Sequence, residues 1–296
     1  MKLYRYQNGN AKVTIDRNGT RFIEYNGELS LEYPLNLDIR VTTACSLGKN
    51  PKTGKAICDF CHESAIVNGI ECDYHDLMEK MIGLPKGIEL AIGGNKITPE
   101  LINFLNWCKF QDYICNLTVN QLHCQSPTTS NLLKQLVQDQ LIYGLGISYR
   151  KDFPFKVPDW IVDYDNTIMH VITGIDTIDD VLSTPFKKVL VLGYKRFGFG
   201  IDYYCDQVEQ NLKTWRWWVS KLFSKQSLSF DNLALEQLNM RRFFPDDVWE
   251  TFYQGEHSFY IDAVNQTFSP SSRSSKKISW DNMSIREYFL DRNLDT

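Results

Sequence analysis

Short apolar runs recur through the middle of the chain, and polar stretches with helical spacing separate them. Six such runs are rich in isoleucine, valine and leucine and cover residues 35–41, 87–94, 113–120, 142–149, 167–174 and 188–194. Apolar runs of this length between turn residues are typical of buried strands. Strands that alternate with helices indicate a parallel sheet whose outer face is covered by the helices.

Helix signals lie between several of these runs. The stretch 98–110 opens with Thr98 and Pro99, which suit the cap and the first position of a helix. Helical patterns also cover 128–140, 176–183 and about 203–224. Because six strands are found rather than the eight of a full barrel, the pattern predicts an α/β fold, a partial (β/α)6 TIM-like barrel with right-handed crossovers.

The two ends of the chain differ from this core. Asn18-Gly19 and Asn26-Gly27 are hairpin signals among short alternating segments, so residues 1–33 are predicted to form an N-terminal β-meander. Residues 34–225 form the predicted core, and 226–296 are a C-terminal extension with one further strand at 258–264. We expect one domain over 1–296, with both additions as candidate lids over the mouth of the barrel.

Composition excludes some partners. The formal net charge is −4, so no basic field over the whole chain indicates nucleic acid. The first residues lack an apolar signal core, and no window approaches the roughly 18 apolar residues of a membrane span. We therefore expect no membrane partner and a cytoplasmic protein whose thiols stay reduced.

Cysteines and aromatic residues are the next candidates for chemistry. Five cysteines scattered among apolar residues are expected to be buried in the core: Cys72, Cys108, Cys115, Cys124 and Cys205. An aromatic group at helical spacing is also expected to pack in the core: Trp215, Trp217, Trp218 and Phe223.

The remaining three cysteines share one polar loop after the first core strand. Cys45, Cys58 and Cys61 form a C-x12-C-x2-C pattern, and the intervening residues include glycine, asparagine and proline. Three thiolates from one loop can hold three irons of a [4Fe–4S] cluster and leave the fourth iron open for a ligand.

Other readings of this loop remain open. Cys58 to His62 matches the C-x-x-C-H signature of c-type haem attachment, although that chemistry normally needs export. A structural zinc ion could use the three thiolates with Cys72 or His62 as the fourth ligand. The chain would then be a non-catalytic zinc-binding α/β protein.

Polar and small residues gather where the predicted strands end. Parallel strands all end at one rim, so these residues are expected to line one mouth together with the cysteine loop. They are Gly93, Gly94, Asn95, Asn120, Ser148 and Arg150. His170 lies inside an apolar strand, where it either points inward or packs in the core. His62 and Glu63 follow the cysteine loop and either cap a helix or face a substrate.

The cysteine loop and the strand ends over about residues 36–200 resemble the radical S-adenosylmethionine (SAM) superfamily. The common spacing there is C-x3-C-x2-C, and members with an expanded first gap include some makers of 7-carboxy-7-deazaguanine. The resemblance implies that Cys45, Cys58 and Cys61 are ligands of a [4Fe–4S] cluster. It also implies that the backbone at Phe60, just before the last cysteine, contacts the adenine of SAM.

The same resemblance assigns roles to the strand ends. Gly93 and Gly94 match the glycines that let the backbone reach the methionyl amino group of SAM, and Asn95 replaces the usual acid. Asn120 ends the third strand, where the family often has Thr-Asn-Gly. Ser148 matches a common ribose contact, and Arg150 is placed to pair with the SAM carboxylate or an anionic substrate.

These residues together imply a radical SAM enzyme. Its reaction would be [4Fe–4S]-dependent reductive cleavage of SAM to a 5′-deoxyadenosyl radical, which abstracts hydrogen from an unidentified substrate. A small molecule, a nucleotide-like molecule or a peptide would fit as substrate. A low-potential electron donor such as a flavodoxin or ferredoxin is the implied protein partner.

Overall fold

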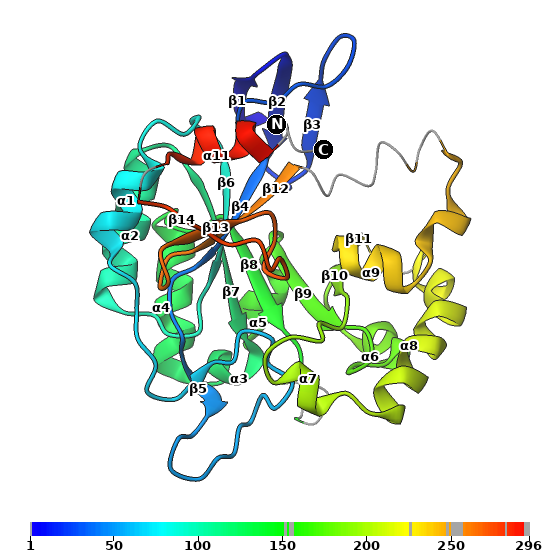
Figure 1. Cartoon of the computed structure of the whole chain (residues 1–296). Helices are drawn as coiled ribbons and strands as arrows, with labels where there is room; N and C mark the ends of the chain where they lie inside the picture. The colour runs from blue at the N-terminus through cyan, green and yellow to red at the C-terminus, as the bar shows by residue number, and fades with distance from the viewer. Residues whose placement is uncertain are drawn as a thin grey trace.

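A mostly parallel sheet runs through the centre of the chain (Figure 1). The computed structural model describes residues 2–150, 153, 157–224, 227–246, 249, 257–281 and 283–292. In these residues ten strands pair in the order β11-β10-β9-β8-β7-β6-β4-β12-β13-β14. All strands from β11 to β12 in this order run parallel, and β13 and β14 are antiparallel to their neighbours.

The six predicted strands are all present. They are β4 (Asn36–Arg40), β6 (Glu89–Gly93), β7 (Ile114–Asn120), β8 (Gly144–Ser148), β9 (Thr167–Ile172) and β10 (Lys188–Leu192). The further strand expected near 258–264 is β12 (Ser258–Asp262), and it pairs with β4. Four of the described strands were not predicted: β5 (Ala44–Lys49), β11 (Ser227–Phe230), β13 (Thr267–Ser269) and β14 (Ile278–Ser279).

Among the described strands the sheet is open. β11 forms one edge and β14 the other, and no pairing joins them. The α/β class and the mostly parallel sheet are therefore confirmed, while the barrel form stays a prediction.

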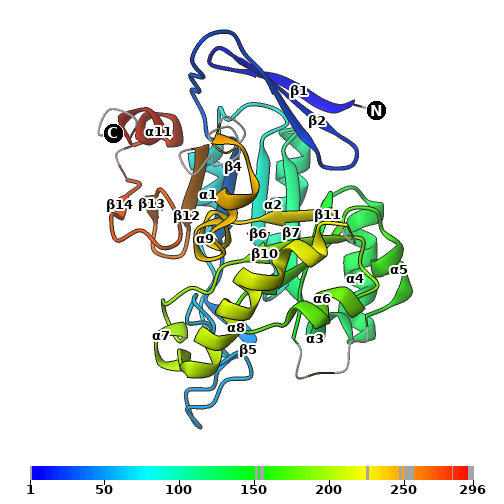
Figure 2. The same cartoon turned by 90° about the vertical axis from the view of Figure 1, so that its right-hand side faces the viewer.

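Helices surround the sheet (Figures 1 and 2). Thr98 accepts a hydrogen bond from Leu101 N at the start of α2, as predicted, because its hydroxyl satisfies a free N–H of the first turn. The main helices that follow strands are α1 (Tyr74–Met81), α2 (Pro99–Phe110), α3 (Gln121–Cys124), α4 (Pro127–Gln138), α5 (Asp159–Asp163), α6 (Ile178–Ser183), α7 (Gly200–Tyr203), α8 (Asp206–Trp218) and α9 (Asn232–Gln237).

The two faces of the sheet differ in chemistry. The outward-facing side chains of the central strands are apolar and at most 3% exposed, and they include Leu37, Ile39, Leu90, Ile92, Leu117, Val119, Ile147, Met169, Val171, Val189 and Val191. Burying one such side chain contributes about 1.5–3 kcal/mol. The alternate residues face inward, and many remain open to solvent: Asn36, Asp38, Asn116, Thr118, Asn120, Ser148 and His170.

The N-terminal meander lies away from the cysteine loop. β1 (Lys2–Asn8), β2 (Ala11–Asp16) and β3 (Arg21–Glu24) form a separate antiparallel sheet. Arg21 pairs with Glu89 at the start of β6, and Lys188 Nζ donates to Asn18 O at the start of β10. Figure 1 shows this sheet at the top and β5 (Ala44–Lys49), in the cysteine loop, at the bottom. The meander covers the end of the sheet at which the parallel strands begin. The expectation that it is a lid over the mouth, where the strands end, was therefore wrong.

The C-terminal segment completes the main sheet. β12 extends the sheet beside β4, and α11 (Ile285–Arg292) packs over it, with the Tyr288 ring centroid 5.2 Å from that of Phe259. The lid role expected for 226–296 stays a prediction.

Two core predictions need correction. Trp215 is 1% exposed, but Trp217, Trp218 and Phe223 are 75%, 51% and 45% exposed. The buried stripe of α8 contains Val208, Leu212 and Trp215, and the next tryptophans fall outside it because a helix repeats every 3.6 residues. Of the five scattered cysteines, four are buried and Cys205 is exposed, because it precedes α8 at the surface. None of the described helices combines the length and apolar character that crossing a membrane requires.

Candidate functional site

The cysteine loop leaves the end of β4 and folds back on itself. Two hydrogen bonds of 2.8 Å close a turn that reverses the chain. Gly54 N donates to Asn50 O, and Asn50 N donates to Lys55 O. Cys58 N then donates to Leu47 O at 2.9 Å, which brings Cys58 back to β5. The long gap between the first two cysteines is therefore a hairpin whose two ends meet.

The three thiols lie in one small cluster apart from the main core. Cys45, Cys58 and Cys61 pack together with Leu47 and Ala65. Burial raises the pKa of Cys45 and of Cys61. Hydrogen bonds from backbone N–H groups to the two sulfurs lower it in part. Backbone donors aimed at sulfur stabilise a thiolate, which is the form that binds metal.

Arg150 places a positive charge on this cluster. Its guanidinium donates to the Ile57 carbonyl and lies 3.4 Å from Cys58 Sγ. Gln121 Oε1 accepts from Arg150 N at 2.9 Å and fixes its backbone. Burial raises the pKa of Cys58 to about 11, against the opposing charge of Arg150. The structure places Arg150 against a cysteine, and its expected pairing with the SAM carboxylate or an anionic substrate stays a prediction.

The spacing of the sulfurs bears on the kind of metal group. The three sulfurs do not all lie within 4.8 Å of one another. A tetrahedral zinc ion with bonds of about 2.3 Å needs sulfurs about 3.8 Å apart, whereas a cluster of several irons spreads its ligands more widely. Cys72 packs in the main core, not with the three thiols. Three gathered thiols are the donor set that an iron–sulfur cluster with one open iron needs, and which metal group they hold stays a prediction.

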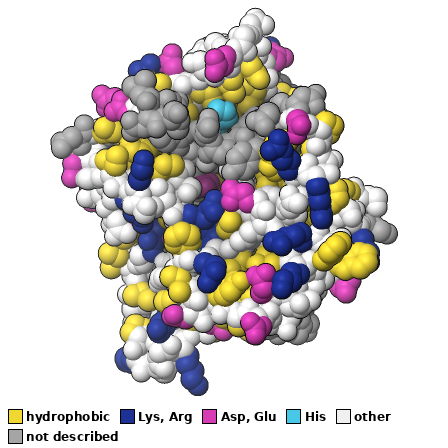
Figure 3. All heavy atoms as spheres, turned by 45° about the vertical axis from the view of Figure 1, so that its right-hand side comes forward, with side chains coloured by type: hydrophobic (Ala, Val, Ile, Leu, Met, Phe, Trp, Pro, Cys, Tyr) yellow, Lys and Arg dark blue, Asp and Glu magenta, His cyan; other side chains and the backbone are white. Residues whose placement is uncertain are grey.

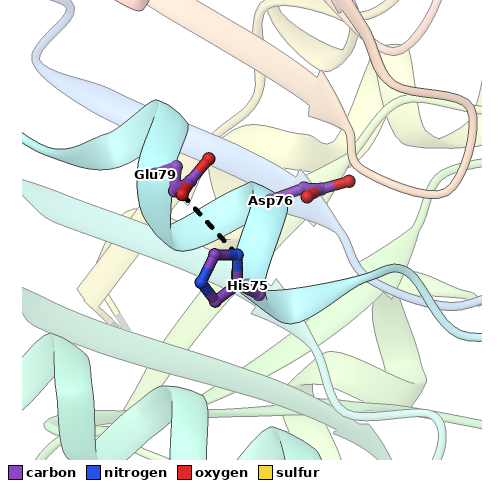
Figure 4. A group of neighbouring side chains, drawn as sticks. All are labelled: His75, Asp76 and Glu79. Carbon is purple, nitrogen blue, oxygen red and sulfur yellow. Dashed lines mark ion pairs between the residues drawn. The ribbon is translucent and has the colours of Figure 1, made fainter.

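A different trio meets the distance criterion for a single ion in the described part of the chain. His75, Asp76 and Glu79 lie together on α1, where His75 Nδ1 is 3.7 Å from Glu79 Oε1 (Figure 4). The side chains of His75 and Glu79 are 79% and 64% exposed. This is the geometry of an ordinary surface pair one helical turn apart.

Of the predicted strand-end residues, Asn120 reaches a cysteine, and Ser148 pairs with Asn120 on the neighbouring strand. Asn120 Nδ2 is 3.9 Å from Cys58 Sγ, and its Oδ1 accepts from Leu122 N to cap α3. Ser148 pairs in register with Asn120 on one side and His170 on the other. Residues from β7, β8 and β9 thus form one row across the inner face, and the cysteine loop lies beside its Asn120 end.

Gly93, the last residue of β6, and Gly94, which follows it, face opposite ways. A Cβ at Gly94 would lie 2.8 Å from Val119 Cγ1 and 2.9 Å from Leu117 Cγ, on the covered face. A Cβ at Gly93 would come no closer than 4.0 Å to a neighbour, Asn95 Nδ2. The open backbone on the inner face is therefore at Gly93, and contact of Gly93, Gly94 and Asn95 with SAM stays a prediction.

Phe60 anchors the turn between the last two cysteines. Its ring meets that of Tyr203 with centroids 5.6 Å apart, and the Arg150 guanidinium lies 5.2 Å from its centroid. Phe199 N donates to Cys61 O at 3.1 Å. The chain after β10 therefore holds the cysteine turn in place.

A charged network beside the cysteines was missed from the sequence. Arg40 NH1 lies 3.1 Å from Asp262 Oδ2, and its Nε is 3.0 Å from Glu63 Oε2 without hydrogen-bond alignment. His62 Nε2 is 3.1 Å from Glu63 Oε1 and 3.2 Å from Lys195 Nζ.

This network sets the charge of its members. Burial opposes ionisation of Glu63, but the hydrogen bond from His62 and the charges of Arg40 and Lys195 outweigh it and lower its pKa to about 2. Burial and Lys195 lower the pKa of His62, so this ring is neutral at neutral pH and Arg40 supplies the main countercharge. The alternation of Asn36, Asp38 and Arg40 with apolar residues in β4 was the available signal of an open face.

The inner face carries two further ionisable groups. Asp38 is exposed, yet the surrounding protein raises the pKa of its carboxyl through desolvation. The His170 ring lies over Gly146, where a Cβ would sit 2.7 Å from its Cε1 and from Thr118 Oγ1. Burial lowers the pKa of His170 to about 4, so the imidazole is neutral at neutral pH.

Comparison with known proteins gives little independent identification. No protein-family model matches the chain, and no curated protein matches its sequence. Among solved structures, the chain is similar to native anSMEcpe with bound AdoMet, with a TM-score of 0.47 and 10% sequence identity. That match covers 89% of this chain and 81% of the other.

Proposed function

We propose that the protein is a radical SAM enzyme whose [4Fe–4S] cluster is held by Cys45, Cys58 and Cys61. The observation that carries this proposal is the hairpin that brings Cys58 back to β5, so that three thiols from a C-x12-C-x2-C pattern share one cluster of side chains. Three thiolates leave one iron of such a cluster free for SAM. When bound, the cluster supplies the electron that cleaves SAM to a 5′-deoxyadenosyl radical.

The residues around the thiols have distinct tasks in this proposal. Arg150 balances the negative charge that thiolate ligation brings, and Asn120 offers an N–H to Cys58. Gly93 leaves the backbone of β6 open to SAM on the inner face. The pairing of Arg40 with Glu63 and Asp262 ties the second residue after Cys61 to β4 and β12, which keeps the loop in place.

The substrate would bind on the inner face of the sheet. That face offers a carboxylate at Asp38, a neutral imidazole at His170 and a hydroxyl at Thr118, all on the solvent-accessible side. These groups accept or donate hydrogen bonds and would orient a small polar molecule.

Anaerobic reconstitution tests the proposal. The wild-type chain should bind about four irons and four sulfides, absorb visible light and cleave SAM when dithionite is added. Cys45→Ser, Cys58→Ser and Cys61→Ser should each lose the cluster, whereas Cys72→Ser, the matched control, should keep it. A colourless protein that holds one zinc, or loss of metal in the Cys72→Ser variant alone, would contradict the proposal.

A further inference from the structure

The exposed side of α8 and of the turn after it is both aromatic and basic. Trp217 and Trp218, at the end of α8, are 75% and 51% exposed, although tryptophan is mostly buried in folded proteins. Three exposed cations lie around them in the sequence: Lys213, Arg216 and Lys221. Residues 210–230 include no acidic residue, so this segment contrasts with the formal net charge of −4 of the whole chain.

The segment after α9 packs against this side of α8. Arg242 donates to the backbone carbonyl of Arg216, and Arg216 Nε donates to Gln237 O at 2.8 Å. The ring of Phe243 meets that of Phe223 with centroids 5.3 Å apart. Arg242 is exposed, so it adds a fourth cation to the same surface. We call this surface the α8 patch and define it by Lys213, Arg216, Trp217, Trp218, Lys221 and Arg242.

The cations of the α8 patch lack acidic partners among the described residues. None of the four forms an ion pair there, whereas Arg241, outside the patch, pairs with Asp246 at 3.1 Å. Lys221 Nζ instead lies 3.9 Å from the centroid of the Trp218 ring. An aromatic ring attracts a cation without neutralising it, so the charge stays available to an anionic partner.

Rings and cations share one side of the helix. Lys213 and Trp217 are four residues apart on α8, so they are neighbours on its exposed side. Figure 3 brings the side of the molecule that carries α8 forward and shows basic and hydrophobic side chains intermixed on it. A helix that lies on a membrane separates them, because only its apolar side enters the lipid. Mixed rings and cations are typical of surfaces that bind single-stranded nucleic acid.

We propose that the α8 patch binds a single-stranded nucleic acid. Bases would stack on Trp217 and Trp218, and the four cations would meet the phosphates of the strand. A duplex fits less well, because its bases already stack on one another and their faces are closed to a ring. The inference is independent of the proposed function, since the patch contains none of the residues assigned to the cluster or to SAM.

Binding of labelled oligonucleotides tests the stacking. The full chain is titrated with a labelled oligouridylate and with an oligodeoxythymidylate of equal length, and fluorescence anisotropy reports the affinity. Trp217→Ala should bind about tenfold more weakly than wild type, because one stacked base loses its ring. Phe110→Ala is the matched control: Phe110 is 82% exposed on α2, outside the patch, and its loss should leave the affinity unchanged.

The salt dependence tests the cations. The logarithm of the binding constant should fall with the logarithm of the salt concentration. Lys213→Gln/Lys221→Gln should make this slope shallower by about 1.4, which is about 0.7 for each lost phosphate contact. The control Lys12→Gln/Lys134→Gln removes the same charge from exposed positions on β2 and α4 and should keep the wild-type slope.

Several outcomes would overturn the α8 patch as a nucleic-acid site. They are no binding of either strand at low salt, wild-type affinity in Trp217→Ala, and equal affinity for poly-glutamate, which has the charge but no bases. Binding to phosphatidylserine vesicles and to neither oligonucleotide would assign the patch to a membrane surface instead. A tighter complex with oligouridylate would identify the strand as RNA, and a tighter one with the deoxy strand would identify it as DNA.

Discussion

The two faces of the central sheet are built from alternate residues of the same strands, yet they follow different rules. On β8, Ile147 is 0% exposed against the helices, while its neighbour Ser148 faces the open side in a row with Asn120 and His170. The covered face is uniformly apolar, and the open face mixes carboxylate, amide, hydroxyl and imidazole groups. The covered face therefore supplies most of the apolar burial that stabilises the sheet, and we expect mutations on the two faces to have separable effects.

The largest expected effect is on the covered face. Ile147→Ala should lower the free energy of unfolding by about 2–5 kcal/mol, because it removes buried methyl groups and leaves a cavity. Ser148→Ala, one residue on, should change it by no more than about 0.5 kcal/mol. Chemical denaturation of both variants checks the contrast, and equal losses would mean that the inner face is part of the core.

Gly93, which ends β6, and Gly94, which follows it, offer a sharper pair of variants. Gly94→Ala places a methyl group 2.8 Å from Val119 Cγ1 and should cost about 1–3 kcal/mol of stability through overpacking. Gly93→Ala places the methyl in open space, so its stability should match wild type while SAM binding weakens.

Thermal unfolding and equilibrium binding of SAM to reconstituted protein measure the two effects of the glycine pair. A Gly93→Ala variant with normal SAM affinity would remove this residue from the cofactor site. A stable Gly94→Ala variant would mean that the covered face has room at this point.

The apolar runs made most of the sheet predictable, because a strand buried on one face keeps its apolar residues whatever its partners are. Thr98 was likewise a local signal, since a cap depends only on the next few residues. β11 escaped prediction because its sequence, SLSF, is short and half polar, and pairing with β10 alone makes it a strand.

Contacts between distant segments could not be predicted. Arg40 and Asp262 are 222 residues apart in sequence and meet only because β12 pairs with β4. The position of Arg150 against Cys58 depends on how the cysteine hairpin folds, and the opposite orientations of Gly93 and Gly94 depend on the register with β7. The sequence named several of these residues, but pairing and loop closure decide what each one touches.

His170 should link the open face to pH. Its pKa in the folded chain is about 4, below the ordinary 6.5, because burial disfavours the charged ring. Between these values the unfolded chain binds more protons, so the free energy of unfolding falls as the pH falls, and this loss ends below about pH 4.

The matched variant for this effect is His170→Gln. From about pH 7 to about pH 5, wild type should lose about 1 kcal/mol more free energy of unfolding than the variant. This is less than the whole difference between the folded and unfolded pKa values would give, because the ring is partly exposed and solvent screens its charge. Urea unfolding at both pH values provides the measurement. Parallel losses in the two proteins would show that the ring is solvated on the inner face.

The smallest expected effect concerns the trio on α1, which meets a metal-site distance criterion but lies on the surface, away from both sheet faces. Its His75–Glu79 contact spans 3.7 Å between two mostly exposed side chains, so water and salt screen it. Glu79→Gln should change the free energy of unfolding by no more than about 0.5 kcal/mol, and less at high salt. Zinc added to the wild-type chain should raise its thermal midpoint no more than it raises that of Glu79→Gln. A larger rise in the thermal midpoint of wild type would mean that the trio on α1 binds zinc although its side chains are exposed.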